Sequence, residues 1–379
     1  MTYKIPFNKP HLTGKEFDYI KNSIQLKHLS GNGEFTKKTQ LWLKNNIGCK
    51  KALLTDSCSD ALEIAAILAD IRPGDEIIMP SYTFVSTANS FVLRGGIPVF
   101  VDIRPDTLNI DETKIEEAIT AKTKAIVPVH YAGVGCEMNV IQEIAKRHNL
   151  LVIEDAAQGI MSTYEGKPLG GMGDLGAISF HETKNISSGE GGVLLINNPI
   201  YAERAEIIWE KGTNRAQFFR GEIDKYTWVD IGSSFLPSDM KAAFLLAQLE
   251  EAQLITQKRL KIWNQYHQGL AKLEKQGKIH RPIIPSQCQH NGHLYYILLE
   301  NLDIRTQLIE YLKKNGVWAV FHYIPLHSSP AGLEYTRVSG HLKNTDQLSE
   351  RLLRLPFYYD LEEDEINFVI DKIFAFFQL

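Results

Sequence analysis

Short apolar runs alternate with amphipathic stretches between residues 50 and 200. The runs are continuous rather than alternating, which is typical of strands buried on both faces of a mainly parallel sheet. Stretches with helical periodicity lie between several of them, at residues 59–69, 111–118 and 140–148. This order predicts an α/β fold, an open sheet between two layers of helices. The expected strands comprise residues 52–54, 77–79, 99–101, 125–129, 150–153, 177–180 and 193–196.

The pattern changes in the last third of the chain. A long helical stretch begins near Ser238, continues past Arg259 and is expected to connect two domains. Beyond it the pattern predicts strands at residues 294–299 and 317–321 and helices at residues 305–314 and 363–376, a smaller α+β domain. We therefore expect a large α/β domain over residues 1–250 and a small domain over residues 251–379.

Composition excludes several classes of protein. The 379 residues carry a formal net charge of -4 without a long run of Lys or Arg, which argues against nucleic-acid binding. No segment has the roughly 20 apolar residues that span a bilayer, and the start lacks a signal peptide, so we expect a cytoplasmic protein. No metal site is expected, because no pair of the four cysteines has metal-ligand spacing: Cys49, Cys58, Cys136 and Cys288.

The strongest chemical signal is an acid and a lysine that follow two different strands. Asp155 lies in the sequence EDAAQ after the strand at 150–153, and Lys184 follows the strand at 177–180 and precedes a glycine-rich loop. The carboxyl ends of strands in such a sheet form the ligand edge. Alone, the acid could be a helix N-cap and the lysine a solvated loop residue.

Pyridoxal phosphate (PLP) needs this pair of groups. A lysine amine forms the imine, and a carboxylate keeps the pyridine nitrogen protonated so that the ring acts as an electron sink. Asp155 suits the second role, and Gln158 could hydrogen-bond the ring hydroxyl. Lys184 would act as the Schiff-base lysine and later as the base that moves the proton, for which burial should lower its pKa.

Two further segments could contact such a cofactor. The sequence TDSCSDAL at 55–62 joins a strand to a helix, and free N–H groups at a helix N-terminus suit a phosphate; an ordinary N-cap is the alternative. The sequence PSYTFVST at 80–87 offers an aromatic ring to stack on the pyridine, or to pack in the core.

Taken in order, these segments resemble the DegT-type nucleotide-sugar aminotransferases, PLP enzymes with the aspartate aminotransferase (type I) fold. The resemblance implies that Lys184 forms the Schiff base and that Asp155 and Gln158 contact the ring nitrogen and hydroxyl. It also implies that Phe84 stacks on the ring, and that the phosphate is held by Cys58, Ser59 and Ser179. The matching motifs are SCSDAL at 57–62, TF at 83–84, EDAAQ at 154–158, SFHETK at 179–184, GEGG at 189–192 and FHYIPLH at 321–327.

Departures from the family pattern concern the phosphate site. Cys58 and Ser59 stand in place of the usual Gly-Thr, which preserves a backbone N–H and a hydroxyl. Ser234 stands where many members have an Asn that reaches the phosphate in the partner subunit, and Asn214 is a possible substitute. The candidates for substrate binding are His327, Tyr323 and Arg215.

Within the family, the resemblance is greatest to the transaminases that make dTDP-4-amino-4,6-dideoxygalactose for enterobacterial common antigen. It implies transfer of an amino group from L-glutamate to carbon 4 of dTDP-4-keto-6-deoxyglucose, in a homodimer with sites at the subunit boundary. The stretches that carry it are PSYTFVSTAN at 80–89, FHETKN at 180–185, KGTNR at 211–215, DKYTW at 224–228 and DIGSS at 230–234.

Other functions remain open at this stage. A related deoxygenase replaces the lysine with His, so Lys184 favours transamination. A sister enzyme could aminate carbon 3 or give the gluco-configured 4-amino product. A non-catalytic regulatory protein of the same fold would be expected to have lost the lysine or the acid, and both are present.

Overall fold

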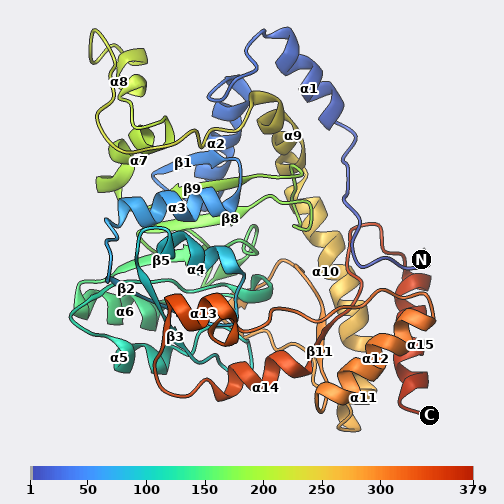
Figure 1. The fold of residues 1–379 in the computed structure, drawn as a ribbon. Coiled ribbons are helices and arrows are strands. Elements are labelled where there is room, and N and C mark those ends of the chain that lie inside the picture. Colours follow the sequence, from blue (N-terminus) through green and yellow to red (C-terminus); the bar gives the residue numbers. More distant parts are fainter. Residues whose placement is uncertain (1–2, 379) are drawn as a thin grey trace.

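An eight-stranded sheet is the centre of the larger region in the computed structural model, which describes residues 3–378 (Figure 1). The strand order is β1-β9-β8-β5-β4-β2-β3-β12. Only β9 is antiparallel to its neighbours, so the sheet is mainly parallel, as the sequence predicts for the type I PLP fold. Its strands are β1 (Lys51–Thr55), β2 (Glu76–Pro80), β3 (Ile97–Val101), β4 (Thr123–Ile126), β5 (Leu151–Asp155), β8 (Leu175–Ser179), β9 (Gly192–Ile196) and β12 (Arg337–Val338).

Successive residues of each central strand pack into opposite faces of the sheet. In β1, Leu53 belongs to one hydrophobic cluster and Leu54 to the other, and Val152 and Ile153 divide in the same way in β5. Burial of each such side chain contributes about 1.5–3 kcal/mol, which explains the continuous apolar runs. One face is covered by α3 (Cys58–Leu68), α4 (Val85–Val92) and α7 (Ala202–Trp209), the other by α2 (Glu34–Ile47), α6 (Met138–His148) and α9 (Asp239–Glu250).

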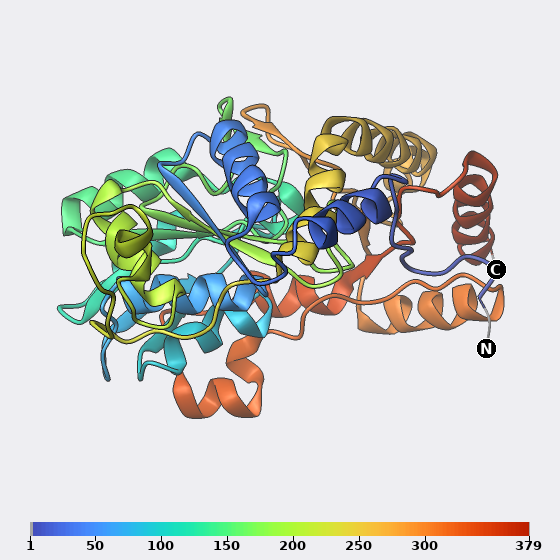
Figure 2. The same cartoon turned by 90° about the horizontal axis from the view of Figure 1, so that it is seen from above.

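A second region has a hydrophobic core of its own. Helices α10 (Ala252–Gly269), α12 (Leu302–Lys314) and α15 (Glu363–Phe376) pack there against the two-stranded sheet of β11 (Tyr296–Leu298) and β13 (Leu352–Arg354). Figure 2 shows it beside the large region, with both ends of the chain on its outer side. The other elements are α1 (Glu16–Gln25), α5 (Ile115–Ala118), α8 (Arg215–Phe219), α11 (Ala271–Lys275), α13 (Pro330–Tyr335), α14 (Lys343–Arg351), β6 (Thr163–Tyr164), β7 (Lys167–Pro168) and β10 (Cys288–Gln289).

The chain passes between the two regions more than once. Ile5 is fully buried in the small region, where it bridges Val317. Far along the chain, β12 returns to the large sheet and pairs with β3. The expected division into residues 1–250 and 251–379 stays a prediction. Ile5, from the first range, packs in the small region, and β12, from the second range, pairs in the large sheet.

Two local expectations differ from the structure. The long helix that begins after Ser238 is interrupted at Glu251 (φ -100°, ψ 7°), where α9 ends and α10 begins. Residues 317–321 form no strand, because their backbone partners come from two separate segments. Val317 forms an isolated β-bridge with Ile5, and Val320 forms another with Arg354, so each pairing involves a single residue of this segment. Between residues 3 and 378, no helix has the length and apolar character needed to cross a membrane.

Candidate active site

Three strands end together at one edge of the large sheet. Thr55 of β1 pairs with Gly192 of β9, and Gly192 pairs with Ser179 of β8. The next strand, β5, ends at Asp155, which is in register with Ala177 of β8. The turn after β1, the end of β8 and the end of β5 are therefore neighbours, although they lie far apart in the sequence.

Asp155 is held from two sides and is nearly buried, with 4% of its surface exposed. One carboxylate oxygen, Oδ2, accepts a hydrogen bond of 2.6 Å from the Thr87 hydroxyl. The other, Oδ1, accepts one of 3.0 Å from the Ala157 N–H. Thr87 in turn shares a 2.8 Å hydrogen bond with Thr83, so the carboxylate is oriented by α4 as well as by its own strand. Each oxygen retains lone pairs for a further donor.

Lys184 lies in the turn that links β8 to β9. The turn is closed by backbone hydrogen bonds from Phe180 N–H to Gly191 O (2.8 Å) and from Glu182 N–H to Gly189 O (2.7 Å). Desolvation lowers the pKa of the Lys184 amine, and the charge of the nearby Asp155 opposes part of this shift. A larger fraction of the amine is therefore neutral than for a solvated lysine, as a nucleophile or base requires.

The N-terminus of α3 faces the same edge. Ser57 caps this helix, and its hydroxyl accepts a hydrogen bond of 3.1 Å from the Asp60 N–H. The N–H groups of Cys58 and Ser59 have no acceptor within the helix because they belong to its first turn. A Cβ added to Gly192 would lie 2.4 Å from the Cys58 nitrogen, so only glycine lets β9 pack this closely against the turn. Free N–H groups at a helix N-terminus can bind an anion such as phosphate.

Two serine hydroxyls complete this candidate anion site. Ser59 contacts the Ser86 hydroxyl at 2.6 Å, which ties α3 to α4. Ser179 is 5% exposed, and its Oγ accepts a weak hydrogen bond of 3.4 Å from the His181 N–H. Burial raises the pKa of the Cys58 thiol far above its ordinary value, and the Asp155 charge adds to the shift. Cys58 is therefore an uncharged group in this turn.

Gln158 connects the large region to the segment before α13. Its Oε1 accepts a hydrogen bond of 2.7 Å from the Ala132 N–H, and its Nε2 donates one of 3.1 Å to the Tyr323 hydroxyl. Phe84, the N-cap of α4, is 57% exposed and lies with its ring centroid 6.3 Å from that of Tyr323. Phe84 is thus a large exposed aromatic ring beside buried polar groups.

The remaining sequence candidates lie in two other settings. His327 is held between Ser81, 2.8 Å from its Nδ1, and Asp346, 3.1 Å from its Nε2. Arg215 is exposed at the start of α8, where its guanidinium covers the rings of Phe219 and Tyr226. Helix α8 projects from the periphery of the large region (Figure 1).

Asn214 and Ser234 are the candidates for contact with the cofactor phosphate in the partner subunit's site, and both lie in the same loop as Arg215. The Asn214 side-chain oxygen accepts a hydrogen bond of 2.8 Å from the Thr227 N–H. Ser234 is exposed and bridges Glu210. Their contacts are within this loop, and the roles considered for them stay predictions.

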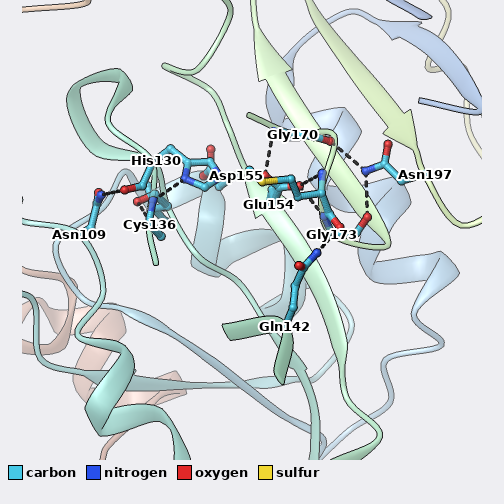
Figure 3. A network of polar contacts seen from close by, with 12 residues as sticks. Asn109, His130, Cys136, Gln142, Glu154, Asp155, Gly170, Gly173 and Asn197 are labelled. Atoms are coloured by element: carbon cyan, nitrogen blue, oxygen red, sulfur yellow. Dashed lines mark hydrogen bonds and ion pairs between the residues drawn. The ribbon is translucent and has the colours of Figure 1, made fainter. Parts of the chain in front are cut away.

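A buried hydrogen-bond network around Glu154 lies next to Asp155 (Figure 3). Glu154 is fully buried, and its carboxylate accepts hydrogen bonds from three backbone N–H groups, those of Gly170 (2.8 Å), Met172 (2.6 Å) and Gly173 (2.6 Å). It also lies 2.9 Å from His130 Nε2. The Cys136 N–H donates to His130 Nδ1, so this nitrogen carries no proton and Nε2 is the donor to Glu154. The network fixes the β5 strand end from which Asp155 projects.

We expect Glu154→Gln to lower the free energy of unfolding by about 3 kcal/mol, because a single amide oxygen cannot satisfy four buried donors. Chemical denaturation of the variant and the parent measures this difference. Glu143→Gln, the same change at an exposed position of α6, should stay within about 0.5 kcal/mol of the parent. Equal losses in both variants would show that the network contributes nothing specific.

Sequence reasoning missed two residues at this edge. Thr87 ends the segment PSYTFVST at 80–87, but its spacing from Asp155 along the chain does not indicate a bond between them. Arg354 of β13 also acts on the Lys184 amine, and its charge contributes to the lowered pKa there. An arginine within the apolar sequence LLRLP at 352–356 was the available signal.

Comparisons with known proteins agree with this arrangement. Residues 10–374 match the DegT/DnrJ/EryC1/StrS aminotransferase family. The chain is 36% identical to an uncharacterized protein of Methanocaldococcus jannaschii, over 90% of this chain and 89% of that protein. It is 34% identical to GDP-perosamine synthase of Caulobacter vibrioides, over 97% and 96% of the two chains.

A solved structure matches the chain along its whole length. The putative sugar aminotransferase Spr1654 of Streptococcus pneumoniae in its PLP form superposes with a TM-score of 0.90 at 26% identity, covering 99% of both chains. The same protein has also been solved in a pyridoxamine phosphate (PMP) form. The likeness therefore extends over both regions of the structure.

Proposed function

Because the chain belongs to the DegT/DnrJ/EryC1/StrS aminotransferase family, we propose that it transfers the amino group of L-glutamate to carbon 4 of dTDP-4-keto-6-deoxyglucose. The products would be dTDP-4-amino-4,6-dideoxygalactose and 2-oxoglutarate. The enzyme class is that of a PLP-dependent sugar aminotransferase, and the cofactor is PLP. The observation that carries the site assignment is the meeting of Asp155, Lys184 and the α3 N-terminus at one sheet edge.

The residues at this edge fit the cofactor group by group. PLP supplies an electron sink when its ring nitrogen is protonated. Asp155 would hold that proton, since Thr87 and Ala157 orient its oxygens and leave lone pairs for the ring N–H. Gln158 would bond the ring hydroxyl, and the exposed Phe84 would cover one face of the ring.

The phosphate would lie at the N-terminus of α3. There the first-turn N–H groups of Cys58 and Ser59 combine with the Ser59 and Ser179 hydroxyls. A neutral Cys58 thiol introduces no charge repulsion. Gly192 lets β9 pack directly against this turn, because an added Cβ would clash with the Ser57 and Cys58 backbone.

Lys184 would have two tasks in the reaction. Its ε-amine would hold the cofactor covalently, and after release by the amino donor it would carry a proton between carbon atoms of the substrate and the cofactor. The lowered pKa serves the second task, because a neutral amine can accept that proton near neutral pH.

The sugar nucleotide is the part of the proposal that depends most on sequence likeness. The stretches at 80–89, 180–185, 211–215, 224–228 and 230–234 favour a dTDP-linked 4-keto-6-deoxy sugar. A relative at 34% identity is named GDP-perosamine synthase, so a GDP-linked sugar is the second candidate. His327 and Tyr323 would contact the sugar from the segment before α13.

We further propose a homodimer whose sites lie at the subunit boundary. The loop that carries α8 exposes aromatic side chains that a monomer would leave in water, with Phe219 64% and Trp228 74% exposed. Arg215 belongs to this loop and would act at the site of the partner subunit. A monomeric mass in solution together with full activity would contradict this arrangement.

To identify the acceptor, the holoenzyme is given L-glutamate together with one keto sugar at a time. The keto sugars are 4-keto-6-deoxyglucose and 4-keto-6-deoxymannose, each linked either to dTDP or to GDP. We expect the dTDP-linked glucose derivative to be converted most efficiently and product NMR to show an axial 4-amino group. A 3-amino sugar, a gluco-configured 4-amino sugar or a preference for the GDP-linked compound would overturn the substrate assignment while retaining the aminotransferase.

A further inference from the structure

A buried segment at the boundary between the two regions contacts the turn that carries Lys184. Residues 291–293 lie between β10, which pairs with β6 in the large region, and β11, which pairs with β13 in the small region. Asn291 is fully buried, and His293 is 9% exposed. Polar side chains that are buried to this extent need hydrogen-bond partners inside the protein.

Asn185, the residue after Lys184, has both ends of its side-chain amide bound to this segment. Its Nδ2 donates a hydrogen bond of 3.0 Å to the Asn291 carbonyl, and its Oδ1 lies 2.8 Å from His293 Nδ1. A rotated amide would place two acceptors against each other at the Asn291 carbonyl, so Oδ1 faces the imidazole and Nδ1 carries a proton. Burial lowers the pKa of His293 well below its ordinary value, which keeps the ring neutral. The neutral ring is therefore a fixed donor to Asn185.

The same segment is bonded to the backbone of Gln158. Asn291 Nδ2 donates to the carbonyl oxygens of Gln158 (2.8 Å) and Ile160 (2.7 Å). Gln158 follows strand β5, whereas the turn with Lys184 follows strand β8. Residues 291–293 thus connect the surroundings of two groups that come from different strand ends.

Arg259 of α10 fixes the segment from the small region. Its Nε donates a hydrogen bond of 3.0 Å to the Gly292 carbonyl, and its Nη2 donates one of 2.7 Å to the His293 carbonyl. The arginine is 4% exposed, and its guanidinium lies over the Phe357 ring, 4.8 Å from the centroid. Hydrogen bonds from a charged donor are about twice as strong as those between neutral groups. The segment is therefore held firmly on the side that faces away from the lysine turn.

We infer that Asn185 and His293 are positioning residues that hold the Lys184 amine at the aldehyde carbon of PLP. The inference rests on the proposed function, in which this amine condenses with the aldehyde and releases water. The aldehyde is attached to the pyridine ring beside the hydroxyl, and Gln158 is assigned to that hydroxyl. A segment bonded to both Gln158 and Asn185 sets the distance between the amine and the aldehyde. Such positioning raises the effective concentration of the amine and favours condensation.

Binding of PLP and of PMP to the cofactor-free chain separates this role from simple packing. PMP has an aminomethyl group in place of the aldehyde, so it can use the same ring and phosphate contacts but cannot condense with Lys184. We expect His293→Leu to weaken PLP binding by about 10-fold, the effect of one lost buried hydrogen bond, and to change PMP binding by less than about 2-fold. His293→Asn keeps an N–H group near the position of Nδ1 and should recover most of the PLP affinity.

His290→Leu is the matched control, because it makes the same change three residues away. His290 packs on the Trp263 ring, 4.6 Å between centroids, and should leave both affinities at the level of the parent. Asn185→Ala removes the two contacts from the lysine side and should reproduce the loss seen in His293→Leu. Thermal unfolding without cofactor checks that each variant is folded, and Asn185→Ala decides the question if His293→Leu does not fold.

Two results would overturn the inference. Equal losses of PLP and PMP affinity would show that the whole site is disturbed, and parent-like PLP affinity in the folded variants would show that the contacts do not position the amine. Failure of the proposed function has a different signature, because the parent itself would then develop no visible band with PLP. Since PLP and PMP are the ligands used, the result does not depend on which sugar is the acceptor.

Discussion

Replacing Lys184 with alanine is expected to lower the rate of transamination by about 10⁴-fold. Removal of a positioned base alone costs about 10²–10⁴-fold, and Lys184→Ala also removes the amine that attaches the cofactor. The purified variant should lack the visible absorbance of the covalently held cofactor. Lys167→Ala, at an exposed position, should keep the rate and the spectrum of the parent.

This expectation depends on the position of Lys184 and on its surroundings. The turn from β8 to β9 fixes its backbone, and desolvation lowers the pKa of its amine. A Lys184→Ala enzyme that still aminated the keto sugar would refute the assignment of the catalytic lysine. The regulatory alternative would gain support only if the parent itself were inactive.

Asp155→Asn is expected to slow both half-reactions by about 10³-fold while the cofactor stays attached. The amide has the shape of the carboxylate but no charge, so it cannot hold the proton on the ring nitrogen. Losses of this size are typical when a group that stabilises transition-state charge is removed. The new amide would keep an oxygen for either Thr87 or Ala157, so we expect the variant to fold.

The two variants therefore differ in their spectra. Lys184→Ala should lose the covalent cofactor band, whereas Asp155→Asn should keep a shifted band and react slowly with L-glutamate. Single-turnover absorbance measurements with L-glutamate distinguish these outcomes. A rate for Asp155→Asn within about 10-fold of the parent would remove Asp155 from the ring nitrogen.

The sequence was most informative where local pattern and chemistry coincide. Continuous apolar runs identified the central strands because each is buried on both faces, as Leu53 and Leu54 illustrate. Asp155 and Lys184 were detectable because both follow such runs, and parallel strands bring their carboxyl ends to one edge. Their spatial proximity in the structure follows from strand order, which their spacing along the chain does not specify.

Other features depend on contacts between distant segments and could not be derived in this way. The partners of Val317 and Val320 come from the N-terminal segment and from β13, so an apparent strand at 317–321 reduces to single bridges. Arg354 is far from Lys184 in the sequence, and only the fold brings its charge near enough to contribute to the lowered pKa of that amine. The exposed loop with Arg215, Asn214 and Ser234 has no defined function within one chain, because its proposed task lies in the partner subunit.

The most direct test of this account follows the visible absorbance of the purified, PLP-loaded protein. We predict a band that bleaches on addition of L-glutamate and returns on addition of dTDP-4-keto-6-deoxyglucose, so that both halves of the reaction are seen in one cuvette. Bleaching without recovery would retain the aminotransferase and reject this sugar as the acceptor. A protein that develops no band with added PLP would contradict the assignment of Lys184 and Asp155 to the cofactor.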